Sequence, residues 1–221
     1  MVGRPANRPN RRKSHRDRIY EDYLIRIQSG EITFEDRLVD VAIAEEEGVS
    51  RMPVRDALMR LVNEGYLSTS TRGFVIPEWD RKDVLEVFEV RRMLDPRAAA
   101  LAAHHIDDTQ LQHMKRAVAD AVQTLETKDT PAFYRGSEAF RNGWLSAVPN
   151  SYLRQAIYRY QSQVQAVRLV TMVDTDSHKT IVTGQQELLD AFTARNSIRA
   201  ADLMLKFVIE AETSYSKLAR G

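Results

Sequence analysis

Two arginines four residues apart are the side chains in this sequence best suited to recognising another molecule. Arg51 and Arg55 lie in the run EGVSRMPVRDAL, which begins at Glu47. Residues four apart project from one face of a helix, so the two guanidinium groups would point the same way. A guanidinium can bond guanine through two N–H groups at once, for roughly 1–3 kcal/mol of discrimination between bases. The pair therefore predicts contact with base edges in the major groove of DNA.

The neighbouring residues predict a helix that presents these arginines. Gly48 permits a tight turn, Ser50 can cap the helix with its hydroxyl, and Pro53 falls in the first turn, where its missing N–H is not needed. The opposite, apolar face of the helix consists of Val54, Ala57, Leu58 and Leu61. We expect a recognition helix docked on a core through this face. The alternative is an exposed helix whose arginines pair with Asp56 or Glu64.

This helix falls within a unit, residues 19–77, that we predict to be a winged helix-turn-helix. Apolar residues at helical spacing predict one helix before Gly30 and a second that ends at Gly48. After the recognition helix, Tyr66–Leu67 and Gly73–Ile76 have the character of two short strands joined by a polar stretch. Three helices followed by a hairpin form the winged helix-turn-helix arrangement.

The same stretch resembles the DNA-binding domain of the GntR family of transcription regulators. The likeness rests on Arg37–Leu38 followed by Asp40, on GVSRMPVRDALMRLVNEGYL from Gly48, and on Arg72–Val75. It implies a set of DNA-contacting residues: Arg37, Ser50, Arg51, Pro53, Arg55, Arg72 and Gly73. Gly73, at the tip of the wing, would approach the minor groove. Phe34–Glu35 replaces the usual Pro-Gly, and we expect a changed turn without loss of function.

The first 18 residues, 1–18, form a basic segment with seven Lys or Arg and one Asp. Without Leu, Ile or Phe, this segment cannot bury enough apolar surface to offset the entropy lost on ordering, so we predict a disordered basic arm. The arm could lie along DNA phosphates or serve as a solubilising tail. Over all 221 residues, 32 Lys and Arg nearly balance 31 Asp and Glu, so net charge indicates no partner.

Composition excludes several other classes of protein. The absence of Cys excludes disulfides, thiolate catalysis and Cys-ligated metals, and it suits a reducing cytoplasm. No apolar run approaches the length of a membrane span, and none follows the basic N-terminus as in a secretory signal. No Gly-rich phosphate loop, nucleophile elbow or pair of catalytic carboxylates stands out. We therefore expect a cytoplasmic protein that is not an enzyme and does not enter a membrane.

The remainder of the chain, residues 81–221, has helical periodicity throughout. Short loops between six expected helices predict an antiparallel bundle, and Pro96 should bend or briefly break the first helix. The predicted fold is thus mainly α, with an N-terminal winged helix-turn-helix and a C-terminal all-helical bundle. This bundle resembles the FCD-type C-terminal domain of the FadR subgroup of the GntR family. The matching residues are Arg91–Asp95, Phe140, Pro149–Leu153, Asp190–Phe192 and Ala200–Met204.

Many members of that subgroup hold a divalent metal with one Asp and three His. The corresponding positions in this sequence are Ser137, Arg141, Gln185 and Phe207. None of the four can serve as its usual ligand, and a guanidinium does not bind metal ions. The resemblance therefore implies an effector domain without a metal at this site and without another cofactor.

Arg141 in a ligand position suggests that a fixed cation attracts a carboxylate or phosphate of a small effector. Four further residues would complete this effector site: Arg91 as a second clamp, Ser137 and Gln185 as hydrogen-bonding groups, and Phe207 as an apolar wall. Alternatively, Arg141 pairs with Glu138 or another acid and the pocket has closed, or a metal is held elsewhere.

We expect a transcription regulator, in the repressor role, that binds palindromic operator DNA as a homodimer. The dimer contacts would come mainly from the helical domain. A small anionic metabolite between the helices would change the spacing of the two winged domains, and with it the affinity for the operator. The alternative is an architectural DNA-binding protein with no effector, which would discriminate little between an operator and random DNA.

Overall fold

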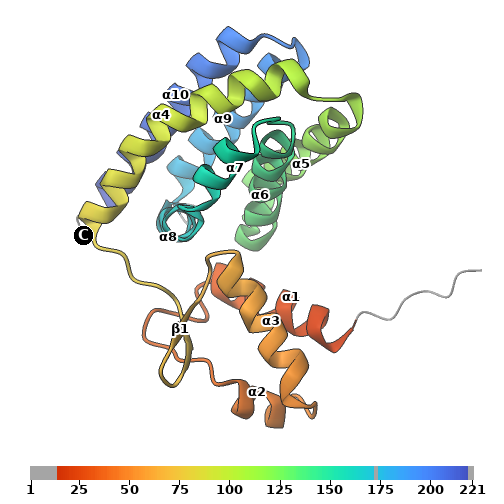
Figure 1. Cartoon of the computed structure of the whole chain (residues 1–221), viewed down its shortest axis with the longest axis vertical. Helices are drawn as coiled ribbons and strands as arrows, with labels where there is room; N and C mark the ends of the chain where they lie inside the picture. The colour runs from red at the N-terminus through yellow and green to blue at the C-terminus, as the bar shows by residue number, and fades with distance from the viewer. Residues whose placement is uncertain (1–13, 172–173, 219–221) are drawn as a thin grey trace, which may run out of the picture.

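The computed structural model describes residues 14–171 and 174–218, which form a small N-terminal domain and a larger helical domain joined by one connecting segment (Figure 1). The small domain contains α1 (His15–Gln28), α2 (Asp40–Glu46), α3 (Arg51–Asn63), β1 (Ser68–Ser70) and β2 (Gly73–Val75). The larger domain contains α4 (Arg81–His105), α5 (Asp108–Thr127), α6 (Thr130–Ser146), α7 (Ser151–Tyr158), α8 (Gln161–Thr171), α9 (Thr175–Thr193) and α10 (Ser197–Leu218). This architecture confirms the predicted fold class.

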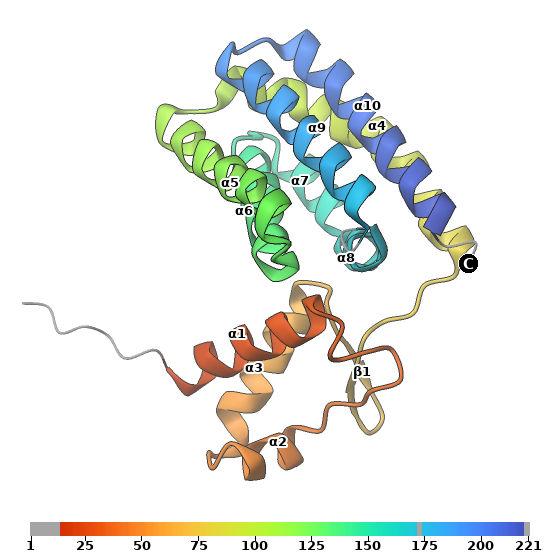
Figure 2. The same cartoon turned by 180° about the vertical axis from the view of Figure 1, so that it is seen from behind.

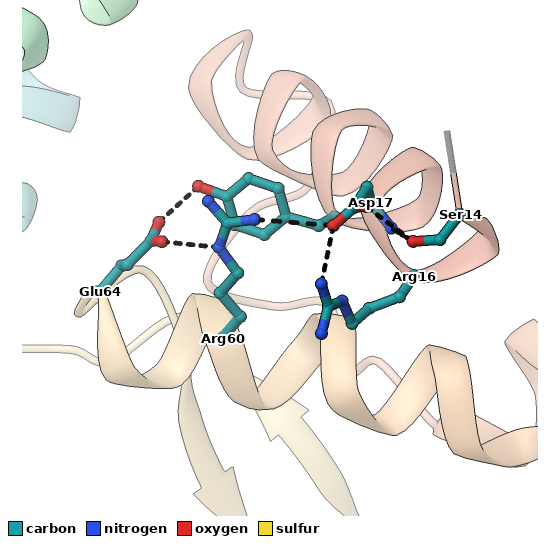
Figure 3. Close-up of polar contacts among 6 residues, drawn as sticks. Ser14, Arg16, Asp17, Arg60 and Glu64 are labelled. Atoms are coloured by element: carbon teal, nitrogen blue, oxygen red, sulfur yellow. Dashed lines mark hydrogen bonds and ion pairs between the residues drawn. The ribbon is translucent and has the colours of Figure 1, made fainter. Parts of the chain in front are cut away.

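Helix α1 begins earlier than the sequence suggested. Ser14 occupies its N-cap, where the hydroxyl accepts a hydrogen bond from the Asp17 backbone N–H at 3.1 Å. Asp17 also forms an ion pair with Arg16 and lies 4.0 Å from Arg60 on α3 (Figure 3). The prediction of disorder is therefore wrong for residues 14–18, because this capping and the contact with α3 order them. Residues 1–13 of the predicted arm lie outside the described residues.

Helices α1 and α3 pack against each other to form the core of the small domain. Their buried apolar side chains are Ile19, Tyr23, Leu24, Ile27, Val54, Ala57, Leu58 and Leu61. At the edge of this core, the Tyr20 hydroxyl donates to Glu64 at 2.5 Å, and the Arg60 guanidinium lies 3.6 Å from the centroid of the Tyr20 ring. Glu64 also accepts from Arg60 Nε at 3.0 Å (Figure 3). This polar cluster links α1 to the C-terminal end of α3 at the edge of the core.

The first strand of the wing begins two residues later than predicted. The first strand is Ser68–Ser70, which pairs antiparallel with Gly73–Val75, and not Tyr66–Leu67. Tyr66 and Leu67 are both buried, and both of their backbone N–H groups donate to the carbonyl of Leu61 at the end of α3. Successive strand residues point to opposite faces, so two adjacent buried side chains here belong to a turn and not to a half-exposed strand.

The helical domain is built around the long pair α4 and α10; α6 and α9 pack against this pair, and α5 packs against α6 and α9 (Figure 2). Helix α4 continues through Pro96, so of the predicted bend or brief break the break is wrong. Val84 and Phe88 before the proline, and Ala98 and Ala102 after it, all belong to the main core, and this packing holds the helix on both sides of the proline. The single helix expected over about 151–174 is two helices, α7 and α8, separated at Arg159–Tyr160. The described part of the domain thus has seven helices and not six. None of the described helices is long and apolar enough to span a bilayer.

Candidate nucleic-acid interface and effector cavity

Helix α2, the start of α3 and the hairpin turn all lie at the end of the molecule away from the helical domain (Figures 1 and 2). Gly48, with φ +63°, makes the turn between α2 and α3. Ser50 is the N-cap residue of α3, but its hydroxyl makes no capping hydrogen bond, contrary to the expected cap. Pro53 lies in the first turn of α3, as expected.

Arg51 and Arg55 project from the start of α3 with 56% and 52% of their side chains exposed. Both bond Oδ2 of the buried Asp40 on α2: Arg51 through Nε at 2.9 Å and Arg55 through Nη1 at 3.4 Å. The alternative pairing with Asp56 or Glu64 is wrong, because the partner comes from the preceding helix. Burial works to raise the pKa of Asp40, but the hydrogen bonds and charges of the two arginines outweigh it and hold the pKa below its usual value.

Arg37 and Arg72 are exposed on the two segments that meet beside the wing. Leu38 and Phe74 exchange two backbone hydrogen bonds of 2.8 Å, which brings the neighbours of both arginines together. A Cβ on Gly73 would lie 2.3 Å from the Leu38 carbonyl oxygen, and its φ of +134° also favours glycine. Packing of the wing therefore requires glycine here, whatever this residue does at a minor groove.

In the helical domain, the five residues predicted for the effector site line one cavity of about 60 Å³. They are Arg91 on α4, Ser137 and Arg141 on α6, Gln185 on α9 and Phe207 on α10. Two further polar side chains, Arg168 and Thr171 on α8, also line it. Four facing helices and α8 thus bring these side chains to one place, and apolar side chains such as Val167 and Met204 fill the rest of the wall.

The cavity has more buried positive charge than negative charge. Arg91, Arg141 and Arg168 are 8%, 7% and 8% exposed. Asp95 is the carboxylate beside them: its Oδ2 accepts from Arg91 Nε at 3.0 Å and lies 3.9 Å from Arg141 Nη1. Arg91 and Arg141 therefore share one carboxylate, and Arg168 adds a third buried positive charge to the cavity wall. The alternative that Arg141 pairs with Glu138 or another acid is confirmed in its second form, since its acidic neighbour is Asp95, but the cavity has not closed.

Several buried polar atoms around this cavity have no hydrogen-bond partner within the described part of the chain. They are Nε and Nη2 of Arg141, Nη1 of Arg168, Oγ of Ser137 and Oε1 of Gln185. Burial lowers the pKa of Arg141 to about 10; the charge of Asp95 opposes this shift, and the charges of Arg91 and Arg168 add to it. Arg141 remains positively charged at neutral pH. Buried unpaired donors and charges are costly, so these atoms are available to water or to a polar ligand.

Sequence reasoning missed two functional residues: Arg168, which lines the cavity, and Asp95, which pairs with the lining residue Arg91. Arg168 lies within the apolar run VQAVRLV of α8, and a lone charge in such a run was an available signal. Asp95 was noted only as part of a motif, although it lies four residues after Arg91 and so on the same helix face.

The residues present do not fit a metal ion at this position. Arg141 and Phe207 offer no donor to a metal, and Gln185 and Ser137 are neutral. Within residues 14–171 and 174–218, no three His, Asp or Glu side chains are grouped closely enough to hold one. The side chains of this cavity therefore suit an anion and not a metal cation.

A winged helix-turn-helix with exposed arginines at the start of its third helix, followed by a separate helical domain, defines a class of DNA-binding regulators. Residues 15–75 match the family model described as bacterial regulatory proteins, gntR family, and residues 86–209 match the FCD domain. The chain belongs to the GntR family and has an FCD domain as its C-terminal part, which confirms the resemblance seen in the sequence.

Relatives with this arrangement are described as HTH-type transcriptional regulators. YdhC of Bacillus subtilis is 22% identical over 173 residues, 77% of each chain. McbR of Escherichia coli is 30% identical over 106 residues, 48% of each chain. The solved structure of Escherichia coli McbR/YncC has a TM-score of 0.72, with 20% identity over 93% of this chain and 99% of that one. A GntR regulator from Rhodococcus has a TM-score of 0.67, with 21% identity and the same coverage.

Proposed function

We propose that this protein regulates transcription by binding operator DNA through Arg37, Arg51, Arg55 and Arg72, and that a small anion in the FCD cavity controls this binding. The observation that carries the anion is the buried charge: three guanidinium groups line the cavity, and the one carboxylate beside them, Asp95, contacts only Arg91 and Arg141. An anion that bonds Arg141 and Arg168 would satisfy donors that are otherwise buried and unpaired. The protein acts by binding, without catalysis, within the cytoplasm.

The size of the cavity limits the effector. At about 60 Å³ it is smaller than the engineered cavity of about 150 Å³ that holds benzene. In this conformation it suits an anion of the size of inorganic phosphate or a very short dicarboxylate. A surplus of two positive charges favours a dianion over a monoanion.

The boundary between the two domains offers a path from this cavity to the DNA-binding helix. The Tyr66 hydroxyl, just after α3, donates to Glu138 on α6 at 2.9 Å, and Glu138 also accepts from Gln165 on α8 at 3.4 Å. A Cβ on Gly65 would lie 2.7 Å from Ser162 Cα, so the end of α3 closely approaches α8. The cavity residue Arg168 is on the same helix, α8, as Gln165.

The charge of Arg168 acts on this boundary. Burial, together with the charge of Glu138, raises the pKa of Tyr66, and the charge of Arg168 works in the opposite direction. An anion bound to Arg168 would cancel part of that positive charge and change the balance at Glu138. We expect this change to favour a different placement of the two domains and so to weaken DNA binding, as in a repressor released by its effector.

A homodimer provides the two recognition helices that a palindromic operator needs. On α10, Ile198, Leu205 and Ile209 are exposed apolar side chains on one face of the helix, and they support dimer contacts through the helical domain. Sedimentation of the full chain tests this: Ile209→Glu should shift the protein to monomer if α10 forms the interface.

Thermal unfolding in phosphate, sulfate, oxalate or malonate, each compared with chloride at equal ionic strength, tests the anion. A ligand at a hundred times its Kd stabilises the folded state by about 2.7 kcal/mol. We expect at least one dianion to raise the Tm of the wild type and not that of Arg141→Ala, and to release DNA from the wild type only. If no anion acts, or if Arg141→Ala releases DNA unchanged, the anion site is wrong; DNA binding that is insensitive to any ligand and to sequence supports the architectural alternative.

A further inference from the structure

Asp40 is a buried carboxylate at the DNA-reading end of the N-terminal domain, whereas the proposed anion site is in the helical domain. It is the first residue of α2, and its side chain is 7% exposed. One oxygen, Oδ2, accepts from Arg51 at 2.9 Å and from Arg55 at 3.4 Å. A single buried oxygen thus holds both arginines at the start of the recognition helix.

Folding stability alone does not account for this arrangement. Ion pairs with an exposed cation contribute little to stability, because water and salt screen them. Both arginine side chains are more than half exposed. The main effect of Asp40 is therefore on the orientation of the two guanidinium groups.

The negative charge of Asp40 also opposes binding to DNA of any sequence. Attraction between cationic side chains and phosphates supplies most non-specific affinity, and it does not depend on the bases. A carboxylate within hydrogen-bonding distance of Arg51 and Arg55 offsets part of their positive field. Every duplex loses this attraction equally.

A guanidinium in a fixed orientation, by contrast, favours only the correct sequence. Asp40 engages the Nε edge of Arg51 and not its terminal Nη atoms. Bidentate bonding to guanine O6 and N7 needs two parallel N–H groups in one plane. An arginine that is already held loses less rotamer freedom on binding than one that samples many orientations.

We propose that Asp40 is a specificity-determining positioning residue, which orients Arg51 and Arg55 for base recognition and lowers affinity for DNA in general. The proposal depends on DNA binding by the winged domain and not on the anion in the FCD cavity. Loss of effector control would therefore leave it intact.

Binding of the full chain to two duplexes tests the proposal. The first duplex is selected from a random library by the wild-type protein, and the second is a scrambled sequence of the same length and composition. For Asp40→Asn, we expect affinity for the scrambled duplex to rise several-fold and the ratio of the two affinities to fall about tenfold. The slope of the logarithm of scrambled-duplex affinity against the logarithm of salt concentration should become steeper by about one, which corresponds to one more counterion released.

Glu45→Gln is the matched control, because Glu45 is exposed on the same helix and the change removes the same charge. It should change both affinities together and leave their ratio within twofold of wild type. If Asp40→Asn also leaves the ratio within twofold, Asp40 does not position the arginines and the proposal is overturned.

A second variant covers the case in which Asp40→Asn does not fold, as judged by circular dichroism. Asp40→Glu keeps the charge at the start of α2 but moves the carboxylate by one methylene. We expect it to lower the ratio about threefold with little change in scrambled-duplex affinity, because the bidentate geometry is disturbed and the charge is not. An unchanged ratio would count against positioning.

Discussion

Each of the two domains contains a cluster of arginines with one buried aspartate, and the two clusters lie in opposite surroundings. At the DNA-reading end, Arg51 and Arg55 share the buried Asp40 and remain more than half exposed. In the FCD domain, Arg91 and Arg141 contact the buried Asp95, Arg168 lines the same cavity, and all three arginines are themselves buried. In both clusters, one aspartate orients arginines supplied by other turns or helices.

Burial decides what each cluster can bind. Exposed guanidinium groups remain hydrated until a large polyanion approaches, so they suit DNA. In the DNA-free protein they therefore have little effect on the free energy of unfolding. Buried guanidinium groups have lost their hydration, so a small anion that replaces it is bound in a low-dielectric site where each charge counts for more. The same side chain thus serves a surface contact in one domain and an enclosed site in the other.

The largest effect should come from removing the exposed arginines. Arg51→Ala with Arg55→Ala should lower affinity for the selected duplex about a hundredfold or more, towards the non-specific level, because each bidentate contact supplies roughly 1–3 kcal/mol. Fluorescence anisotropy measures it. Arg199→Ala, which removes an exposed arginine on α10, is the control and should leave affinity unchanged. Equal losses in both proteins would mean that the recognition helix is assigned wrongly.

In the buried cluster, Arg141→Met should make the anion-free protein more stable while abolishing its response to anions. Burial lowers the pKa of Arg141, which means that its charge is less favourable in the folded state than in water. Asp95 keeps Arg91 as its partner in the variant. We expect the free energy of unfolding without anion to rise by about 1–2 kcal/mol and anion-induced stabilisation to disappear.

Urea unfolding with and without phosphate measures both changes. Arg135→Met, on the same helix but exposed, is the matched control and should leave anion-induced stabilisation intact. A less stable Arg141→Met that still responds to anions would show that the buried charge is satisfied within the protein.

The connection between the clusters should depend on the hydroxyl of Tyr66. Tyr66→Phe removes the hydrogen bond to Glu138 and should leave anion affinity within about twofold. The effect of the anion on DNA affinity should fall several-fold, since coupling of this kind is typically 1–3 kcal/mol. Tyr134→Phe removes another buried hydroxyl, which has no partner among the described residues, and should leave the coupling unchanged. Equal coupling in all three proteins would exclude this path.

The smallest effect concerns the titration of Asp40. Its pKa in the folded state is lower than its usual value, so the carboxylate contributes stability that is present above about pH 4 and is lost as pH falls through the folded-state pKa. The stability difference between wild type and Asp40→Asn should be constant from about pH 5 to 8 and should shrink below about pH 4. Chemical unfolding across this range measures it, and a difference that grows on acidification would reverse the sign.

The local pattern of the sequence determined much of this protein. The run from Gly48 to Leu67 specified a turn, a helix with arginines on one face and apolar side chains on the other, and the family to which it belongs. In the helical domain, the family resemblance predicted that five residues form one site, and all five line one cavity. They are Arg91, Ser137, Arg141, Gln185 and Phe207. Helical periodicity is a property of neighbouring residues and can therefore be read without the fold.

Only the tertiary structure decided which aspartate Arg51, Arg55 and Arg141 meet. Asp40 reaches Arg51 and Arg55 from another helix, and Arg168 joins the cavity from α8. The uninterrupted helix through Pro96 was likewise set by packing against distant segments. Pairing energies and burial depend on contacts between residues far apart in the chain, and spacing along one helix carries no information about them.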